Sequence, residues 1–248
     1  MGSAFAHRWA EKGHQLILCD HSPKKAESLA HETKGKTASM KEAAAHAEVI
    51  LIAVKPKDLR EIQLGELKKE QIVLSILAGV PVHLLKTAIR GGEVIRMMPN
   101  LAVKLGEGVL ATVAPPEEKL RGRLRTLFEG LGEIFWVEEE KLEAITALAG
   151  SGPAYLLAVA EAMVEAGIAM GLSAQEAEAL VLQTGLGTLA MLKDKGGHPG
   201  QLLWEISSPG GTTIHGMLAF EEQGVRFGIA KALLEAYRRA LQMKGEKK

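Results

Sequence analysis

The 248-residue chain has one cysteine, few aromatic residues (4%) and no net charge. Cys19 alone cannot form an internal disulfide, and the start has no signal-like pattern, so we expect a cytoplasmic protein. Thirty basic residues balance thirty acidic ones, which gives no charged surface for nucleic acid. The longest uncharged stretch, residues 144–160, contains glycine and proline and is too short to span a membrane, so no membrane association is expected.

Two kinds of catalytic site also lack their signatures. The eight histidines show no H-x-x-x-H or cysteine-rich spacing, so no metal site is expected. Ser208 and His215 are accompanied by no G-x-S-x-G elbow, which argues against a hydrolase.

Up to about Lys141, short apolar runs alternate with helical patterns, which predicts a parallel sheet covered by helices. The runs are brief, rich in β-branched residues and bounded by turns. We expect strands at residues 15–19, 49–54, 72–77 and 93–98, another opening at Thr37, and a pair at 109–113 and 134–137.

Beyond Lys141 the spacing of alanine and leucine predicts helices only. Capping-box patterns begin helices at Ser39 and Ser173, and Ser22 precedes a proline suited to a first helical turn. The expected fold is α/β: a Rossmann-like dinucleotide-binding domain at residues 1–139, its first strand missing, followed by an all-helical domain at 140–248.

The N-terminal residues match the end of a dinucleotide-binding loop. In G-x-G-x-x-G the third glycine lies where the helix packs on the sheet, and Met1 and Gly2 occupy that place. Asp20 closes the next strand and can bind the adenosine ribose of NAD or cap the following helix. Ser22 and Lys24 can instead hold the 2′-phosphate of NADP, so the choice between NAD and NADP stays open.

Two further segments follow predicted strands and are candidates for the nicotinamide side of the cofactor. Ala53, Val54, Lys55 and Pro56 follow one strand, and Pro99 and Asn100 follow another. Open α/β sheets bind ligands at the carboxyl ends of their strands, so we expect the two segments at a common edge.

Two glycine-rich turns open helices in the second half. Ser151, Gly152 and Pro153 form one, and the segment from Ser208 through Gly210 and Gly211 to Thr212 and Thr213 forms the other. Exposed amides at a helix start suit a carboxylate without an arginine. Together the turns predict a site for a small anion.

Several motifs form a recognisable set: Met1–Ala4, Ala53–Pro56, Ser75–Gly79, Arg96–Asn100, Gly150–Tyr155 and, most specific, His198–Leu202 with Ser207–Ile214. Over essentially its whole length the chain resembles the pyrroline-5-carboxylate reductases, which perform the last step of proline synthesis. Leu101 and Ala149 depart locally from threonine and serine in that family.

A larger departure is the absence of the family's first strand and its two glycines. That strand lies in the centre of a doubly wound sheet. We interpret Met1 as an internal methionine of a longer protein. For the chain as given, we expect a gap or a substitute strand in the sheet and poor binding of the diphosphate.

The resemblance implies reduction of Δ1-pyrroline-5-carboxylate to L-proline by hydride from NADPH or NADH. It implies Thr213 at the ring nitrogen and Thr212, with the Gly210 and Gly211 amides, at the carboxylate. Ser208 lies in the same loop, and the Ser151–Pro153 turn forms a facing wall. It also implies a homodimer through the helical domain and leaves open a decamer of dimers.

Two alternatives remain at this stage. A β-hydroxyacid dehydrogenase has a similar two-domain plan but needs a catalytic lysine where Glu161 and Glu165 stand. The missing strand also permits a helical dimerisation scaffold with an inactive nucleotide domain.

Overall fold

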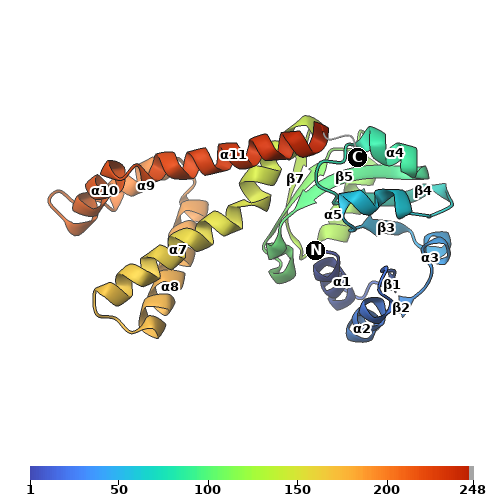
Figure 1. Cartoon of the computed structure of the whole chain (residues 1–248), viewed down its shortest axis with the longest axis horizontal. Coiled ribbons are helices and arrows are strands. Elements are labelled where there is room, and N and C mark those ends of the chain that lie inside the picture. The colour runs from blue at the N-terminus through green and yellow to red at the C-terminus, as the bar shows by residue number, and fades with distance from the viewer. Residues whose placement is uncertain (246–248) are drawn as a thin grey trace. The chain divides into compact units, whose positions relative to one another are not determined.

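Helices and strands alternate through the first part of the structure, a computed structural model that describes residues 1–245 (Figure 1). The strands are β1 (Ile17–Leu18), β2 (Lys36–Thr37), β3 (Val49–Ile52), β4 (Glu66–Ser75), β5 (Arg90–Pro99), β6 (Gly108–Val113) and β7 (Gly132–Val137). The helices between them are α1 (Gly2–Glu11), α2 (Pro23–Thr33), α3 (Met40–His46), α4 (Val82–Ala88) and α5 (Glu118–Phe128), with short 3-10 turns η1 (Pro56–Glu61) and η2 (Leu101–Leu105).

Only helical elements follow Val137 in the described chain, as the sequence predicts. They are η3 (Glu139–Lys141), α6 (Leu142–Ile145), the π-helical turn η4 (Thr146–Gly150), α7 (Gly152–Ala169), α8 (Ala174–Lys195), α9 (Pro199–Glu205), α10 (Thr212–Glu222) and α11 (Val225–Gly245).

The chain divides into two units. The first comprises Met1–Gly150 and the chain from Ala236 onward, and the second is Ser151–Glu235. Because α6 and η4 pack against β5, the first helical turns still belong to the first unit. The units therefore divide later than residue 139, where the sequence predicts the domain boundary.

The strands form two separate sheets. Strands β1 and β2 make a parallel pair, and β3 to β7 form a five-stranded sheet in that order. Among the described strands β1 and β3 do not pair with each other, so the expected gap is present. Each of these edges leaves backbone groups without a ladder partner.

One pair of strands departs from the predicted parallel sheet. Strands β5 and β6 are antiparallel, whereas the other pairs are parallel. Only residues 100–107 connect them, and a parallel crossover needs a dozen residues or more. The short connection therefore turns the chain straight back.

Some predicted strand limits were wrong. The strand expected at 15–19 is reduced to Ile17–Leu18, and the one expected at 49–54 ends at Ile52. The strand expected at 72–77 begins earlier, at Glu66, and ends at Ser75. The first half of this strand is largely polar and shows no apolar run, so no pattern in the sequence predicted it. A register shift between Leu67 and Ile72 also interrupts its pairing with β5.

Alternating side chains place a hydrophobic core on each face of the larger sheet. Ile72 and Leu74 of β4 pack with residues of α1 and α5 on one face. Val73 packs with residues of α3 and α4 on the other. This alternation is the period-two pattern of a strand buried on both faces.

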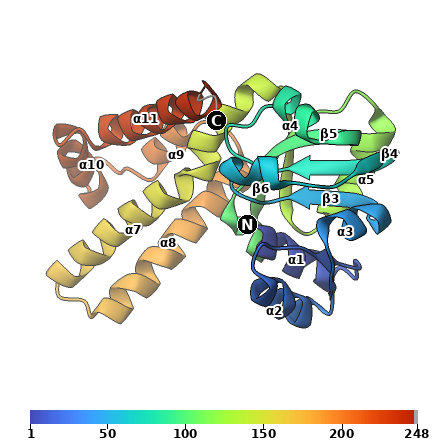
Figure 2. The ribbon, with the colours of Figure 1, turned by 45° about the vertical axis from the view of Figure 1, so that its right-hand side comes forward.

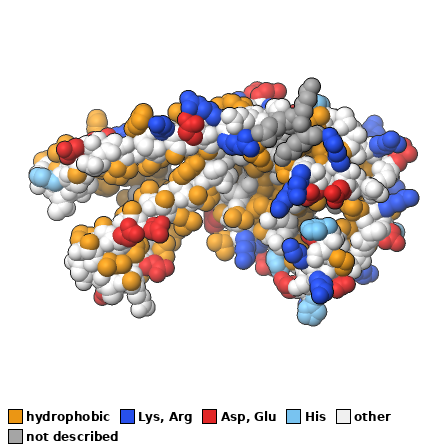
Figure 3. Space-filling view, in the orientation of Figure 1, with side chains coloured by type: hydrophobic (Ala, Val, Ile, Leu, Met, Phe, Trp, Pro, Cys, Tyr) orange, Lys and Arg blue, Asp and Glu red, His pale blue; other side chains and the backbone are white. Residues whose placement is uncertain are grey.

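The second unit is a set of long helices with little core of its own. Helices α7 and α8 lie side by side (Figure 2), and a Ser173–Glu176 capping box begins α8. The Tyr155 hydroxyl donates to the Ala232 carbonyl at 3.5 Å, which joins α7 to α11. Hydrophobic side chains are spread over the surface of these helices (Figure 3).

One described helical stretch, Glu139–Ala169, is long and apolar enough by length and composition alone to cross a membrane, with a mean hydropathy of 1.4. The stretch is divided by the turn η4, and α7 begins anew at Gly152 with Pro153 in its first turn. Apolar exposure of this kind equally suits packing against a second chain.

Candidate cofactor and substrate sites

The start of α1 lies close to the end of β3. A Cβ atom placed on Gly2 would be 3.1 Å from the Cβ of Ala53, so these two cofactor candidates are in contact. Met1 is the residue before the helix, and the first amides of α1 have no helical acceptor. This is the close helix-to-sheet approach expected of the third glycine in a dinucleotide fold.

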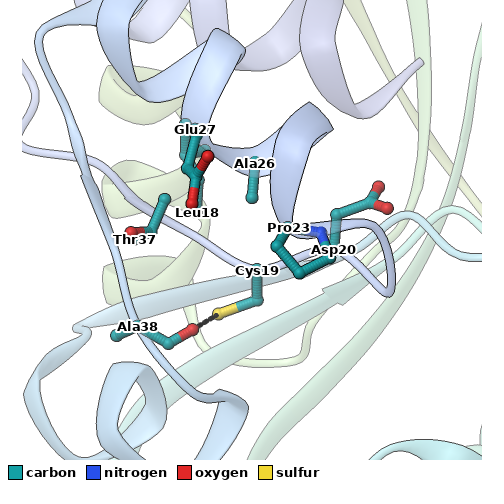
Figure 4. A pocket seen from close by; sticks show the side chains of 8 residues that line it. All are labelled: Leu18, Cys19, Asp20, Pro23, Ala26, Glu27, Thr37 and Ala38. Carbon is teal, nitrogen blue, oxygen red and sulfur yellow. Dashed lines mark hydrogen bonds between the residues drawn. The ribbon is translucent and has the colours of Figure 1, made fainter.

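A surface hollow of about 210 Å³ lies at the carboxyl end of β1 (Figure 4). Cys19, Asp20 and Pro23 line it together with residues of α2 and the chain after β2. Its position matches the adenosine end of a bound dinucleotide. The Cys19 thiol donates to the Ala38 carbonyl at 3.2 Å, and desolvation raises the pKa of this thiol.

Asp20 lies just before α2. Its Oδ1 accepts the Ser22 amide at 2.8 Å and lies 3.2 Å from the His21 ring. Ser22 is the N-cap residue but makes no side-chain capping bond, and Asp20 accepts the amide of Ser22 itself and not an amide of the first turn of α2. Lys24 is exposed on the first turn. The Asp20 carboxylate thus forms a turn just before α2 and does not cap the helix, contrary to the alternative drawn from the sequence.

The nicotinamide candidates lie at the ends of β3 and β5. Val54 and Lys55 are exposed, and Pro56 opens η1. Pro99 is the buried last residue of β5. Strands β3 and β5 both run parallel to β4, so these two ends lie at the same edge of the sheet, as predicted.

Asn100 has a structural role that the sequence does not reveal. Its Oδ1 accepts the Val109 amide at 3.1 Å, and its Nδ2 donates to the Ala149 carbonyl at 3.3 Å. Asn100 thus ties the end of β5 to β6 and to the turn η4.

The loop before α10 is tightly folded and accessible. Gly210 has a φ of +68°, and a Cβ on Gly211 would lie 2.3 Å from the Ser208 Oγ. The positive φ favours glycine at position 210, whereas a side chain at position 211 would require the Ser208 hydroxyl to rotate away. Thr212 and Thr213 are exposed in the first turn of α10, whose leading amides point out of the helix start.

The turn Ser151–Pro153 begins α7, as predicted, but it lies apart from the loop before α10. Helices α9 and α10 place their connecting loop at the end of the second unit away from the start of α7 in both ribbon views (Figures 1 and 2). One chain therefore does not bring the two turns together.

Sequence reasoning missed a buried ion pair beside these sites. Arg96 Nη2 donates to Glu143 Oε1 at 2.9 Å, and each side chain is almost fully buried. The available signal was a lone arginine within the apolar run of β5. Its partner lies 47 residues further along, where no local pattern points to it.

These features define a class of protein. A helix start packed on a sheet edge, a hollow at the carboxyl end of β1 and a separate helical unit with a glycine-rich loop at a helix start are typical of a two-domain, dinucleotide-dependent oxidoreductase. A family model for NADP oxidoreductases, coenzyme F420-dependent, matches residues 1–79. A model for pyrroline-5-carboxylate reductase dimerisation matches residues 139–243.

Relatives identify the family. The pyrroline-5-carboxylate reductase of Aquifex aeolicus is 34% identical over 98% of this chain and 94% of its own length. That of Thermus thermophilus is 37% identical over 79% of this chain and 76% of its own length. The chain belongs to the pyrroline-5-carboxylate reductase family.

Solved structures agree with this assignment. A Streptococcus pyogenes 1-pyrroline-5-carboxylate reductase has a TM-score of 0.85 at 27% identity, covering 95% of this chain and 93% of the other. A Plasmodium falciparum pyrroline carboxylate reductase with NADP bound has a TM-score of 0.85 at 27% identity, covering 98% and 94%. A Mycobacterium tuberculosis 3-hydroxyisobutyrate dehydrogenase, at 18% identity, is similar in fold alone.

Proposed function

We propose that this chain reduces Δ1-pyrroline-5-carboxylate to L-proline, with NADPH or NADH as the hydride donor. The observation that carries this proposal is the family relation over almost the whole chain, together with the open Ser208–Thr213 turn at the start of α10. The residue roles and the assembly described below are part of the same proposal.

The turn before α10 holds the substrate carboxylate. The Gly210 amide and the hydroxyls of Ser208 and Thr212 supply donors at a helix start, where the helix dipole favours an anion. The Gly211 amide, which the resemblance also implied at the carboxylate, instead donates to the Ser208 carbonyl at 3.1 Å. The Thr213 hydroxyl then bonds the ring nitrogen. A protonated imine is already an electrophile, so these residues need only fix its position.

The first unit holds the cofactor. Gly2 and Ala53 allow close approach at the diphosphate, and Asp20, Ser22 and Lys24 lie at the adenosine end. Val54, Lys55, Pro56, Pro99 and Asn100 border the nicotinamide end. When bound, the nicotinamide supplies the hydride, and no metal is required.

The active enzyme is a homodimer joined through its helical units. Exposed apolar side chains on α7 to α11 supply the contact surface. In the dimer, the substrate turn of one chain faces the cofactor domain of its partner, and the Ser151–Pro153 turn closes the site. The protein acts in the cytoplasm, without a membrane, and a decamer of dimers is compatible with this arrangement.

The direct test is the oxidation of NADPH and of NADH, each with added pyrroline-5-carboxylate and each without it. We expect imine-dependent loss of absorbance at 340 nm with at least one cofactor and proline as the product. A chain that binds the cofactor but forms no proline would contradict the proposed function.

The gap between β1 and β3 favours one rival, a helical dimerisation scaffold that binds no nucleotide. Trp9, Trp136 and Trp204 report cofactor binding by fluorescence. A dimer whose fluorescence does not respond to NADPH or NADH would support the scaffold.

A further inference from the structure

A cluster of charges around one buried ion pair joins three parts of the first unit. Arg96 lies on β5, Glu139 and Glu143 lie one helical turn apart in η3 and α6, and Lys244 is near the end of α11. Arg96 bonds Glu143 at 2.9 Å and lies 3.5 Å from Glu139, and Lys244 lies 3.2 Å from the second oxygen of Glu143. Two cations thus meet two carboxylates.

The buried ion pair of this cluster is not an efficient way to stabilise the fold. The Arg96 and Glu143 side chains are 1% and 2% exposed, so both charges have lost their hydration. Two donor atoms of Arg96, Nε and Nη1, have no hydrogen-bond partner. An apolar pair of similar volume often stabilises a fold at least as well as a buried ion pair. What the ion pair adds is a defined direction of contact.

Arg96 and a residue after it contact the turn that precedes α7 or the helix that leads into that turn. Helix α6, which carries Glu143, continues directly into η4 (Thr146–Gly150) and then into Ser151. Four residues beyond Arg96, Asn100 holds the carbonyl of Ala149 at 3.3 Å. The end of β5 therefore fixes η4 on both sides, through Glu143 before it and through Ala149 within it.

The same cluster also holds the returning chain. After leaving the first unit at Gly150, the chain comes back at Ala236, and Lys244 contacts Glu143. Close by, a Cβ on Gly79 would lie 3.0 Å from the Met243 backbone, so the end of α11 is tightly packed. Both connections to the second unit thus end at one ion cluster.

We infer that Arg96 is a positioning residue that, through Glu143, fixes the η4 turn and the Ser151–Pro153 segment for productive binding of the imine. This role rests on the proposed function, because its effect is read on the imine substrate. Arg96 acts through Glu143 and needs no contact of its own with substrate or cofactor.

The test uses the double variant Arg96→Met/Glu143→Met in the full chain, which removes both charges of the fully buried pair together. Glu139 and Lys244 lose these partners but are 24% and 31% exposed, so water can still solvate them. Its matched control is Arg125→Met/Glu118→Met, the same change at an exposed ion pair on α5. We expect both proteins to melt near the parent temperature. In the Arg96/Glu143 variant, amides of residues 146–152 should exchange at least tenfold faster, whereas the control should match the parent.

Steady-state kinetics provide the second measurement. A displaced turn should lower kcat/KM for the imine by about 10- to 100-fold while the KM for NADPH stays near the parent value. A folded double variant with parental exchange and parental imine kinetics would overturn the positioning role. A variant that fails to fold would also overturn it, since the pair would then be structural. If the parent reduces no imine, the proposed function fails, and exchange at 146–152 still decides whether Arg96 orders the turn.

Discussion

Thr212 and Thr213 are neighbours in the first turn of α10, but we expect them to contribute to different steps. Neighbouring helical positions point in directions about 100° apart, so the two hydroxyls cannot serve the same atom of a small ligand. Thr213 is assigned to the ring nitrogen, where hydride transfer changes the charge, and Thr212 to the carboxylate, which is the same before and after the reaction. Only the first assignment predicts an effect on the chemical step.

The variant Thr213→Ala should therefore lower kcat for imine reduction by about 10- to 100-fold, the scale of one hydrogen bond at a reacting centre. Steady-state kinetics with saturating NADPH measure this change. Thr87→Ala is the control, since the Thr87 hydroxyl bonds only the Leu84 carbonyl on α4 of the first unit. Parental turnover by the Thr213 variant would remove the assignment.

Cys19 is a reporter for the adenosine end of the cofactor. Desolvation raises the pKa of its thiol, so the neutral form dominates at pH 7 and alkylation should be slower than for the unfolded chain. The rate should increase as the pH rises, because the thiolate is the reactive form.

Since Cys19 lines the hollow at the end of β1, saturating NADPH should slow its alkylation by iodoacetamide several-fold. Mass spectrometry of the single labelled cysteine measures the rate. An equal rate with and without NADPH, at a concentration shown to saturate the fluorescence change, would place the adenosine end elsewhere.

At the scale of the element, sequence patterns were sufficient where a local signal exists. Apolar runs located all the strands except β2, whose two residues are polar and which ends at Thr37, where a strand was expected to begin. The capping boxes at Ser39 and Ser173 begin helices as predicted. Strand direction was not predictable for β6, because an apolar run reads the same in either direction. The limits of β4 were missed since its first residues are polar and paired across a register shift.

The site was predictable to a similar extent. The glycine turns at Ser151–Pro153 and Ser208–Thr213 do open helices, because glycine and proline act locally. The engagement of Asn100 with Ala149 and of Arg96 with Glu143 depends on tertiary packing between distant segments. No spacing in one sequence contains that information.

The capping box of α8 gives an element-scale prediction. The Ser173 hydroxyl, and then its backbone amide, bond Glu176 and lower the pKa of that carboxyl. Ser173→Ala should reduce the free energy of unfolding by about 1 kcal/mol at pH 7. Urea titrations of parent and variant measure the difference.

The pH dependence follows from the same shift. A carboxyl with a lowered pKa in the folded state stabilises the fold above its ordinary pKa, and this contribution is lost as the pH falls through the folded-state value. The gap between parent and Ser173→Ala should therefore shrink in acid. The equivalent change at the Ser39 box of α3, Ser39→Ala, should behave alike. A gap that grows in acid would contradict the assignment.

At the scale of the whole molecule, the second unit is unlike a domain that folds around its own core. Among its described residues few hydrophobic side chains are buried, while Leu157, Met170 and Trp204 are largely exposed. Such a surface on a soluble monomer would be an aggregation hazard. In the proposed homodimer, a second copy of the same surface, related by a two-fold axis, would cover it and close the assembly.

A charge on this surface should separate the subunits. Leu186 is 68% exposed on α8, with Leu182 and Leu189 on neighbouring turns. Leu186→Glu would bury a carboxylate without a partner in the dimer, so we expect monomers, or a dimer dissociating at much higher concentration, by light scattering after gel filtration. Leu84→Glu makes the same change at an exposed leucine (44%) on α4 of the first unit and should leave the assembly unchanged.

Activity should follow assembly if each substrate turn serves the cofactor domain of the partner. Diluting Leu186→Glu below its dissociation constant should abolish imine reduction while the fluorescence response to NADPH remains, because the first unit binds the cofactor within one chain. The Leu84→Glu protein should retain both over the same dilution. Monomers that reduce the imine at the parental rate would show that one chain builds the whole site. The Ser151–Pro153 and Ser208–Thr213 turns would then have to come together by a movement within the helical unit.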